Sequence, residues 1–339
     1  MTEPQPVRVT DPGSVLSIVP LILGYQPAEG DLVLLGLGER GRLVMAMRVD
    51  AAHVDREAAG QLRGIMRNAQ RSGARSAILV GYGKGEAITP AIDAAVPAAG
   101  DLLIADALRV EGNRYWSYHC TNLECCPAEG REFGAETAAT TALRTHGLTA
   151  EPSREALAAR IAAPQGERAE AARQAWERAL RAPLSVDSGR RAVQEALTGC
   201  RAGKTLDNDD AARLAAAMRM LPVRDDAWAR MTPEHADEHL ALWTDVVRRV
   251  PDAGLAGPAT LLAWCAWQKG NGALANMAID RALEATPEYS MATLVRHALS
   301  AGLPPTAAVP PMTPAEVADS YRAQARHQPE IEHPELEAG

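Results

Sequence analysis

Apolar residues near the start of the chain switch between strand-like runs and helical spacing. Residues 32–37 and 43–49 are rich in Leu, Val and Met, and the GERG link between them is typical of a hairpin turn. Residues 77–80 predict a short buried strand. Between these runs we expect a helix of about 18 residues from Val54. It is indicated by apolar residues that recur at helical spacing, namely Ala58, Leu62, Ile65, Met66 and Ala69.

The next segment repeats this alternation. Residues 87–99 predict a weaker helix, because Pro90 lies near its start and Pro97 near its end. Residues 102–110 and 115–120 predict a second hairpin with Gly112-Asn113 at its tip. Strands separated by helices predict an α/β (α+β) domain over residues 1–148, with a mixed β-sheet and covering helices. The expected order is strand–strand–helix–strand–helix–strand–strand, and the pattern leaves the strand neighbours undefined.

The rest of the chain has mainly helical periodicity. Residues 149–205 predict a helical connecting arm, and residues 206–305 an α-helical bundle domain whose first N-cap lies in Asp207–Asp210. Residues 306–339 are polar and Pro-rich and predict a disordered tail with one helix at 314–328. The other expected helices cover residues 168–180, 190–197, 211–220, 225–231, 233–250, 259–269, 273–285 and 290–301.

Residues 261–289 have the spacing of a single tetratricopeptide repeat. Leu262, Ala266 and Trp267 share one face of a first helix, Gly270-Asn271 makes the turn, and Pro287 ends the second helix. Because repeat arrays need about three units to bury a continuous core, we interpret this unit as one helix pair in an irregular bundle. The spacing predicts an architecture and no reaction.

Composition and charge argue against nucleic-acid and membrane partners. The chain of 339 residues has a formal net charge of −8 and no Lys/Arg-rich run, which argues against a nucleic-acid partner. Its apolar runs reach only about ten residues, too few to cross a bilayer. The first residues lack the pattern of a signal peptide. We therefore expect a cytoplasmic protein with no membrane partner, while the oligomeric state stays undefined.

The strongest candidate for a site is a cysteine cluster. Cys120, Cys125 and Cys126 lie close together in the sequence with His119 beside them. Thiolates and imidazole bind zinc, so Zn²⁺ is a candidate cofactor. Against this, His119 and Cys120 point to opposite faces of a strand, and adjacent cysteines rarely both reach one metal. Redox or disulfide use and simple packing of small thiols are the open alternatives.

Two charged pairs are candidate ligand-binding residues. Arg48 and Asp50 end a strand, where α/β sheets present groups to ligands, and a buried ion pair is the alternative. Asp225 and its neighbour Asp226 follow Pro222 and suit the N-cap and first turn of a helix. Arg224 is placed to pair with a carboxylate.

Two further motifs are better explained by local structure than by ligand or metal binding. The glycine-rich residues 81–85 follow a strand and could cradle a phosphate, but they lack the spacing of a P-loop, which favours a flexible turn. His235 and His239 lie one helical turn apart in the EHADEH stretch. Without a third ligand nearby, a solvated helix face is favoured.

Several stretches occur in a fixed order along the chain. They are VPLILGYQP at 19–27, DLVL at 31–34, RVD at 48–50, the cysteine cluster with Gly130, VRDD at 223–226, Leu242-Trp243 and the block from 261 to 305. In this order they resemble the actinobacterial domain-of-unknown-function 4192 family. The resemblance implies no reaction, ligand or catalytic residue. Asp31 departs from the small hydroxyl residue expected before the Leu-Val strand.

The residues contain no recognisable hydrolase triad or nucleotide fingerprint, so the pattern leaves open whether the protein is an enzyme. We expect a non-catalytic binding or scaffold protein whose helical domain offers the surface for a protein partner. The alternative is an enzyme or small-molecule sensor with a site at the sheet edge near Arg48, Asp50 and the Cys120–Cys126 loop. A third interpretation is a structural metal-binding protein.

Overall fold

The computed structural model describes residues 7–54 and 59–327. The chain divides into two compact units, Met1–Ala162 with Ala266–Ala308 and Ala163–Cys265 with Val309–Gly339. Each unit is therefore built from two separate stretches of the chain. The sequence boundaries at 148, 205 and 305 assume a linear division and stay a prediction.

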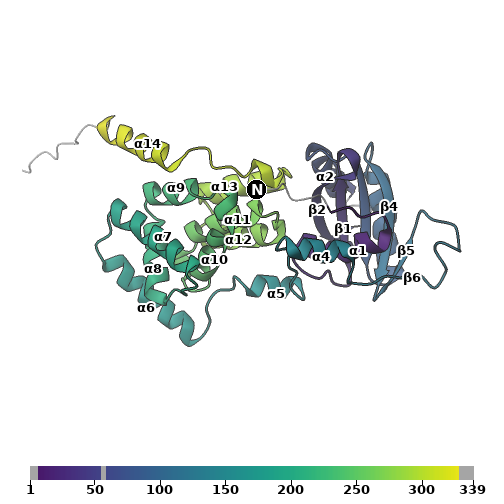
Figure 1. Ribbon diagram of the computed structural model, residues 1–339, viewed down its shortest axis with the longest axis horizontal. Helices are drawn as coiled ribbons and strands as arrows, with labels where there is room; N and C mark the ends of the chain where they lie inside the picture. The colour runs from purple at the N-terminus through teal and green to yellow at the C-terminus, as the bar shows by residue number, and fades with distance from the viewer. Residues whose placement is uncertain (1–6, 55–58, 328–339) are drawn as a thin grey trace, which may run out of the picture. The chain divides into compact units, whose positions relative to one another are not determined.

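The first unit is built on a six-stranded mixed sheet with the strand order β2-β1-β3-β4-β5-β6 (Figure 1). The pair β3–β4 is parallel and the other neighbouring pairs are antiparallel. The strands are β1 (Asp31–Leu37), β2 (Leu43–Asp50), β3 (Ser76–Tyr82), β4 (Leu103–Glu111), β5 (Arg114–Ser117) and β6 (Arg131–Glu132). A mixed sheet with helices, accompanied by a helical region, is the fold class that the sequence predicts.

Both predicted hairpins are confirmed. The link between β1 and β2 contains a short 3-10 turn at Glu39–Gly41. In the second hairpin Glu111 pairs with Arg114, which leaves a loop of two residues, and Gly112 adopts a positive φ of 62° there. Such two-residue loops favour glycine because they match the twist of the strands only in left-handed backbone conformations.

The helices of the first unit include two that the pattern does not predict. These are α1, which begins where Asp11 accepts a hydrogen bond from the Ser14 N–H, and α4, which begins with a capping box at Thr137. The predicted helix from Val54 is α2, and residues 55–58 lie outside the described residues. The bounds are α1 (Pro12–Leu23), α2 (Ala59–Arg71), α3 (Gly85–Ala98), α4 (Ala138–Thr145), α5 (Arg154–Ala159), α12 (Gly272–Ala285) and α13 (Ser290–Ser300).

The sheet is covered on two faces, and adjacent residues of β3 show which helices cover them. A Cβ at Gly81 would meet Ile88 of α3, whereas Tyr82 lines a cavity together with Leu16 and Pro20 of α1. Successive strand residues point to opposite faces, so α3 and α1 lie on opposite sides of the sheet. On the α3 side, β1, β3, α2 and α3 share one buried core that includes Leu34 and Leu79.

The second unit is helical. Its helices are α6 (Glu167–Arg181), α7 (Val186–Arg201), α8 (Asn208–Ala217), α9 (Leu221–Ala229), α10 (Ala236–Val247), most of α11 (Ala256–Gln268) and α14 (Pro314–His327). The predicted N-cap before α8 is confirmed, because the Asp207 carboxylate accepts from the Asp210 N–H. Trp243 is fully buried, and Trp228 and Trp264 pack edge to face with ring centroids 5.0 Å apart.

The helix predicted at 314–328 within the C-terminal tail is present as α14, and it is packed within the second unit rather than isolated. This helix packs against α9, buries Val317 and donates a hydrogen bond from the Tyr321 hydroxyl to Asp225 at 2.6 Å. A polar, Pro-rich stretch can order in this way when a few apolar residues find a partner helix. Residues 328–339 lie outside the described residues.

The turn of the tetratricopeptide-like pair lies where the sequence places it. Gly270 has a positive φ of 74°, and the Asn271 side chain accepts from the Leu274 N–H at 3.0 Å as the N-cap of α12. α12 then packs against α13. Helices α11 and α12 therefore lie on either side of the predicted turn, and the likeness to a tetratricopeptide repeat stays a prediction.

Gly81→Ala should destabilise the first unit, because the added Cβ would lie 2.1 Å from Cγ2 of Ile88. Overpacking of this kind costs about 1–3 kcal/mol in the free energy of unfolding. Gly64→Ala in α2 is the matched control, since no atom lies within 4 Å of its Cβ position, and it should gain about 0.5–1 kcal/mol. Urea unfolding of both variants measures the difference. Equal midpoints would contradict the close packing of α3 on β3.

Candidate functional site

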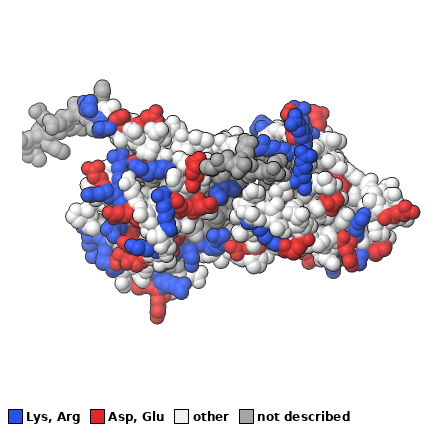
Figure 2. All heavy atoms as spheres, in the orientation of Figure 1, with Lys and Arg blue, Asp and Glu red and all other residues white. Residues whose placement is uncertain are grey.

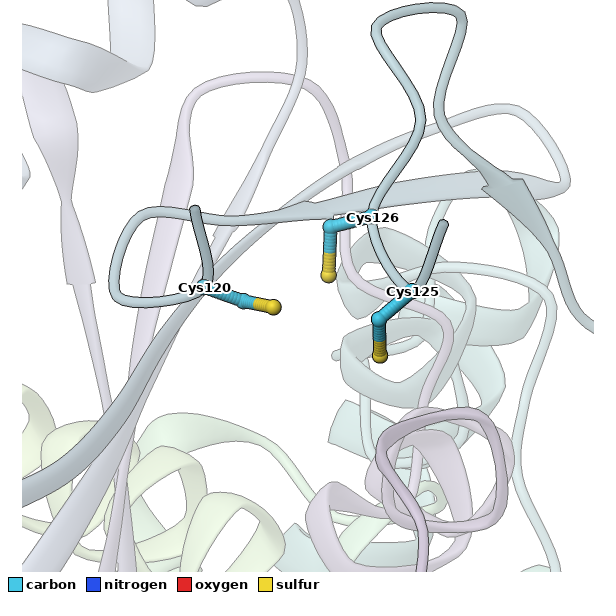
Figure 3. Close-up of side chains that lie close together, drawn as sticks. All are labelled: Cys120, Cys125 and Cys126. Atoms are coloured by element: carbon cyan, nitrogen blue, oxygen red, sulfur yellow. The ribbon is translucent and has the colours of Figure 1, made fainter. Parts of the chain in front are cut away.

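Three thiols converge in the loop between β5 and β6 (Figure 3). The Sγ atoms of Cys120, Cys125 and Cys126 all lie within 4.8 Å of one another. The expectation that adjacent cysteines rarely reach one point does not hold in this loop. A tight turn aims both Cys125 and Cys126 toward the space that Cys120 faces.

Asn122 forms that turn. Its backbone carbonyl accepts from the N–H groups of Cys125 at 3.1 Å and Cys126 at 2.7 Å. Its side-chain oxygen accepts from the Glu124 N–H at 2.9 Å. Asparagine favours such turns because its short side chain can hydrogen-bond the backbone two residues further on. The sequence Asn-Leu-Glu-Cys-Cys therefore fixes the backbone of both cysteines.

The far side of the loop is held by Trp116. The indole N–H donates to the Ala128 carbonyl at 3.0 Å. Gly130 has a positive φ of 80°, and a Cβ there would lie 2.5 Å from the Trp116 ring. The Arg109 guanidinium lies 3.7 Å from the centroid of the same ring. Only glycine fits this position, so Gly130 helps to set the path of the loop.

The thiols line a cavity of about 510 Å³ on the α1 side of the sheet. Asp106 of β4 and Ser117 of β5 also line it, and Asp11 lies at its α1 end. The Ser117 hydroxyl donates to Asp106 at 2.7 Å and accepts from the N–H groups of His119 and Cys120, each at 3.2 Å. This network fixes the point at which the loop leaves the sheet.

The three thiols do not ionise alike. Hydrogen bonding from the Asn122 backbone, and then from the Cys126 thiol, lowers the pKa of Cys120. Burial, and then the interaction with Cys120, raises the pKa of Cys126 to about 11. Cys120 therefore becomes a thiolate before Cys126. A second negative charge beside it is unfavourable unless a cation is bound.

His119 is not part of the group. Its side chain is exposed, and the ligand atoms that come together among the described residues are the three sulfurs alone. β5 ends at Ser117, so the strand alternation expected for His119 and Cys120 does not apply to them.

Arg48 and Asp50 do not join the cysteine loop. Arg48 Nε donates to Oδ1 of Asp31 at 2.5 Å, and Asp31 is 2% exposed, so the buried ion pair is the interpretation that the geometry favours. Asp50 accepts from the Ala52 N–H as a cap. Both residues lie on β2, whereas the cysteines follow β5 near the opposite edge of the sheet. The single sheet-edge site expected from the sequence is not formed.

The prediction that Asp225 and Asp226 cap a helix is wrong. α9 already begins at Leu221 with Pro222 in its first turn, so both carboxylates lie inside the helix. Arg224 Nε donates to Asp225 at 2.8 Å. Asp226 is buried and accepts from Nε of Arg230 at 2.7 Å. Both pairs lie within α9 and its C-cap residue Arg230, whereas Arg190 of α7 forms an ion pair with Asp226 at 3.8 Å and so links two helices.

Two weaker motifs also have structural explanations. Gly81 of the glycine-rich stretch is required where α3 packs on β3. His239, expected on a solvated face, is 2% exposed and its Nδ1 accepts from the Trp243 indole N–H at 3.4 Å. Burial lowers the pKa of His239 to about 4, so its ring is neutral at pH 7.

The fold and site define an α+β protein with a helical unit and a thiol-lined cavity. A family model described as Domain of unknown function (DUF4192) matches residues 12–306, and the chain belongs to that family. No curated protein and no solved structure matches the chain. Within the described residues, no helix has the length and apolar character needed to span a bilayer.

The charged surface is mixed. Red and blue side chains interleave over most of the face in Figure 2. Basic side chains gather over α2, which carries the exposed residues Arg63, Arg67 and Arg71 at intervals of one helical turn. The absence of a nucleic-acid partner stays a prediction.

The sequence interpretation did not select Asn122 or Asp106, which position the thiols. Asn122 had a weak local signal, since an Asn side chain can hydrogen-bond the backbone two residues further on and so favours turns. Asp106 had none, because its partner Ser117 comes from the next strand.

Cys120 should react with iodoacetamide before Cys126, because its lowered pKa gives it a larger thiolate fraction at pH 7. The rate for Cys126 should rise only toward its pKa of about 11. Fragment-ion mass spectrometry can assign the sites, and buried Cys265 serves as the unreactive control. Faster alkylation of Cys126 than of Cys120 would contradict this ordering.

His239 should make the second unit less stable in acid. The unfolded chain binds a proton at this residue below about pH 6.5, whereas the folded state does so only near pH 4. Stability should therefore be full above pH 6.5 and fall by up to about 3 kcal/mol between these values. Comparing urea unfolding of the wild type and His239→Gln from pH 7 to 4 isolates the contribution of His239 to the free energy of unfolding. Parallel pH profiles would argue against a buried neutral histidine.

Proposed function

We propose that the protein binds Zn²⁺ through Cys120, Cys125 and Cys126. The observation that carries the proposal is the convergence of the three Sγ atoms within 4.8 Å of one another. Zn–S bonds of about 2.3 Å in a tetrahedron place sulfurs ~3.8 Å apart. Small side-chain rotations would close that difference, since the backbone of the loop is already fixed by Asn122.

The proposed site has three protein ligands and one open position. The nearby carboxylates are engaged elsewhere: Asp11 accepts from the N–H and hydroxyl of Ser14, and Asp106 accepts from Ser117. The open position therefore faces the cavity of about 510 Å³, where water or a small ligand would complete the coordination. Three protein ligands with an exchangeable fourth are typical of zinc sites that bind or activate a ligand.

The charge of the loop supports a divalent cation. Three thiolates with Zn²⁺ leave one net negative charge. The guanidinium of Arg131 lines the same cavity and donates to the Cys125 carbonyl at 3.3 Å, where it would offset that charge. Burial and then the interaction with Cys120 hold the pKa of Cys126 high, and a bound cation would favour its thiolate against both.

The proposal includes a cytoplasmic location, where thiols stay reduced and available to a metal. A non-catalytic role in binding a protein partner through the helices is compatible with it. In that case the metal would hold the loop for recognition. An enzyme or sensor would use the open coordination position instead.

A metal titration tests the proposal. The full chain, reduced and freed of metal with a chelator, should bind one equivalent of Co²⁺ with thiolate-to-cobalt absorption, and Zn²⁺ should displace it. Cys120→Ser and Cys126→Ser should each weaken binding by at least about 100-fold, the upper range seen even for groups that only support a ligand. Cys200→Ser is the matched control, because Cys200 lies in α7 outside the group.

Two results would overturn the proposal. One is the absence of thiolate-to-cobalt absorption in fully reduced protein. The other is equal binding by wild type and Cys126→Ser. If mild oxidation then joined two of the three sulfurs, redox use of the cluster would replace metal binding.

A further inference from the structure

The sheet of the first unit has an open edge at β2. This strand is the outermost on its side of the sheet, and β1 is its one neighbour among the described strands. Residue pairs across antiparallel strands alternate between hydrogen-bonded and non-hydrogen-bonded ones. The Ala51 N–H donates to the Gly30 carbonyl at 2.7 Å, and the register is regular from there back to Ala46. The N–H and carbonyl groups of Ala46 and Arg48 therefore point away from β1.

A groove runs along this edge. Residues 43–48, six consecutive positions of β2, line a cavity of about 540 Å³. Consecutive strand residues point to opposite faces, so a cavity that touches all six lies at the edge of the strand rather than over one face. Much of the remaining lining lies between Trp267 and Met277 and between Leu299 and Pro305, which belong to the same unit.

Contacts with α1 and α2 hold helices α12 and α13 across the open edge. The Asn68 side chain of α2 donates to the Ser300 carbonyl at the end of α13 at 2.8 Å. Asn271, the N-cap of α12, lies against the end of α1, where a Cβ at Gly24 would be 3.0 Å from its side chain. α2 shares the core on the α3 side of the sheet, and α1 covers the other side. The two helices therefore span the β2 edge and leave the groove beside it.

The lining of the groove is apolar and positively charged. Leu43 and Leu303 line it and are 37% and 47% exposed, which is high for large apolar side chains. Arg48, Arg154 and Lys269 also line it, and no Asp or Glu is among its described lining residues. Arg48 forms the ion pair described above, whereas Arg154 is exposed and has no ion pair in the described part of the chain. The groove is therefore complementary to an acidic partner with apolar side chains.

We propose that the groove binds an extended peptide segment of another protein, with alternating apolar and acidic residues, as an added strand beside β2. Its main chain hydrogen-bonds the outward groups of Ala46 and Arg48. Its apolar side chains cover Leu43 and Leu303, and its carboxylates lie near Arg154. Added strands gain affinity from main-chain hydrogen bonds and specificity from the pockets that take alternate side chains.

Charge makes a second copy of this chain a poorer occupant. Its own β2 would bring Arg48 and no carboxylate over residues 43–48, so like charges would meet across the new strand pair. The groove uses none of the three clustered cysteines, so this proposal stands or falls independently of the zinc proposal.

Fluorescence anisotropy of the full chain with a fluorescein-labelled hexapeptide of alternating valine and glutamate tests the groove. This peptide should bind, and the labelled peptide of alternating valine and lysine should not. Two further versions of the valine–glutamate peptide carry N-methyl groups, one on its valines and the other on its glutamates. Each keeps the side chains but lacks the N–H groups of one edge, so at least one of them should lose binding.

Variants of the protein test the same contacts from the other side. Ala46→Pro removes an outward N–H, and proline is tolerated where the N–H of an edge strand faces solvent. It should weaken binding about 10-fold, the upper effect of one hydrogen bond, with an intact fold in thermal unfolding. Arg154→Gln should weaken binding about 2- to 5-fold, the range for an exposed ion pair. Arg67→Gln, an exposed arginine of α2 outside the groove, should leave binding unchanged.

The controls separate this groove from the thiol cluster and from misfolding. Cys126→Ser should bind the peptide as the wild type does, even if it has lost metal binding. If Ala46→Pro unfolds, the N-methylated peptides test the same main-chain pairing on unchanged protein. The proposal is overturned by absent binding of the valine–glutamate peptide, by equal binding of the valine–lysine peptide, or by retained binding of both N-methylated peptides. Dimerisation of the chain that Ala46→Pro abolishes would assign the edge to a second copy instead.

Discussion

The parallel pairing of β3 with β4 is the constraint on which the first unit depends. Two parallel strands need a crossover connection, and α3 supplies it by packing so closely on β3 that Gly81 must lack a side chain. The same pairing brings the ends of both strands together on the α1 face. Tyr82 lies beside Val110 there, and further along that face Asp106 supports the thiol loop through Ser117.

In the thiol loop, the contacts that fix the backbone are not the interactions that set the pKa values of the sulfurs. The path of the chain is fixed by backbone hydrogen bonds to the Asn122 carbonyl, the contact of Gly130 with Trp116 and the Asp106–Ser117 pair. None of these contacts needs the sulfurs. The sulfurs differ in their ionisation, since hydrogen bonding lowers the pKa of Cys120, whereas burial and then Cys120 raise that of Cys126. A rigid loop that holds competing thiols together is suited to a cation.

Local patterns predicted the hairpins, the order of elements from β1 to β5 and an N-cap in 207–210, because each depends on residues close in sequence. They failed where the structure depends on contacts between residues that are far apart in the sequence. The strand order separates Arg48 from Cys120, and packing in the second unit buries His239. α1 carries Pro20 inside an apolar run, which hides its helical spacing. The convergence of adjacent cysteines depends on the Asn122 turn, which residue spacing alone does not describe.

The β4–β5 hairpin has a consequence for how this chain can vary. Its turn, Gly112-Asn113, forms part of the wall of the cavity beside α1, and its second strand carries Ser117 toward the cavity that the thiols line. Side chains alternate along a strand, so inserting or deleting one residue after the turn would exchange the faces of Tyr115 and Trp116. Ser117 would then leave Asp106, and the cysteine loop would start from the wrong side of the sheet. An insertion or deletion that keeps Ser117 beside Asp106 must therefore lie outside this hairpin or consist of two residues.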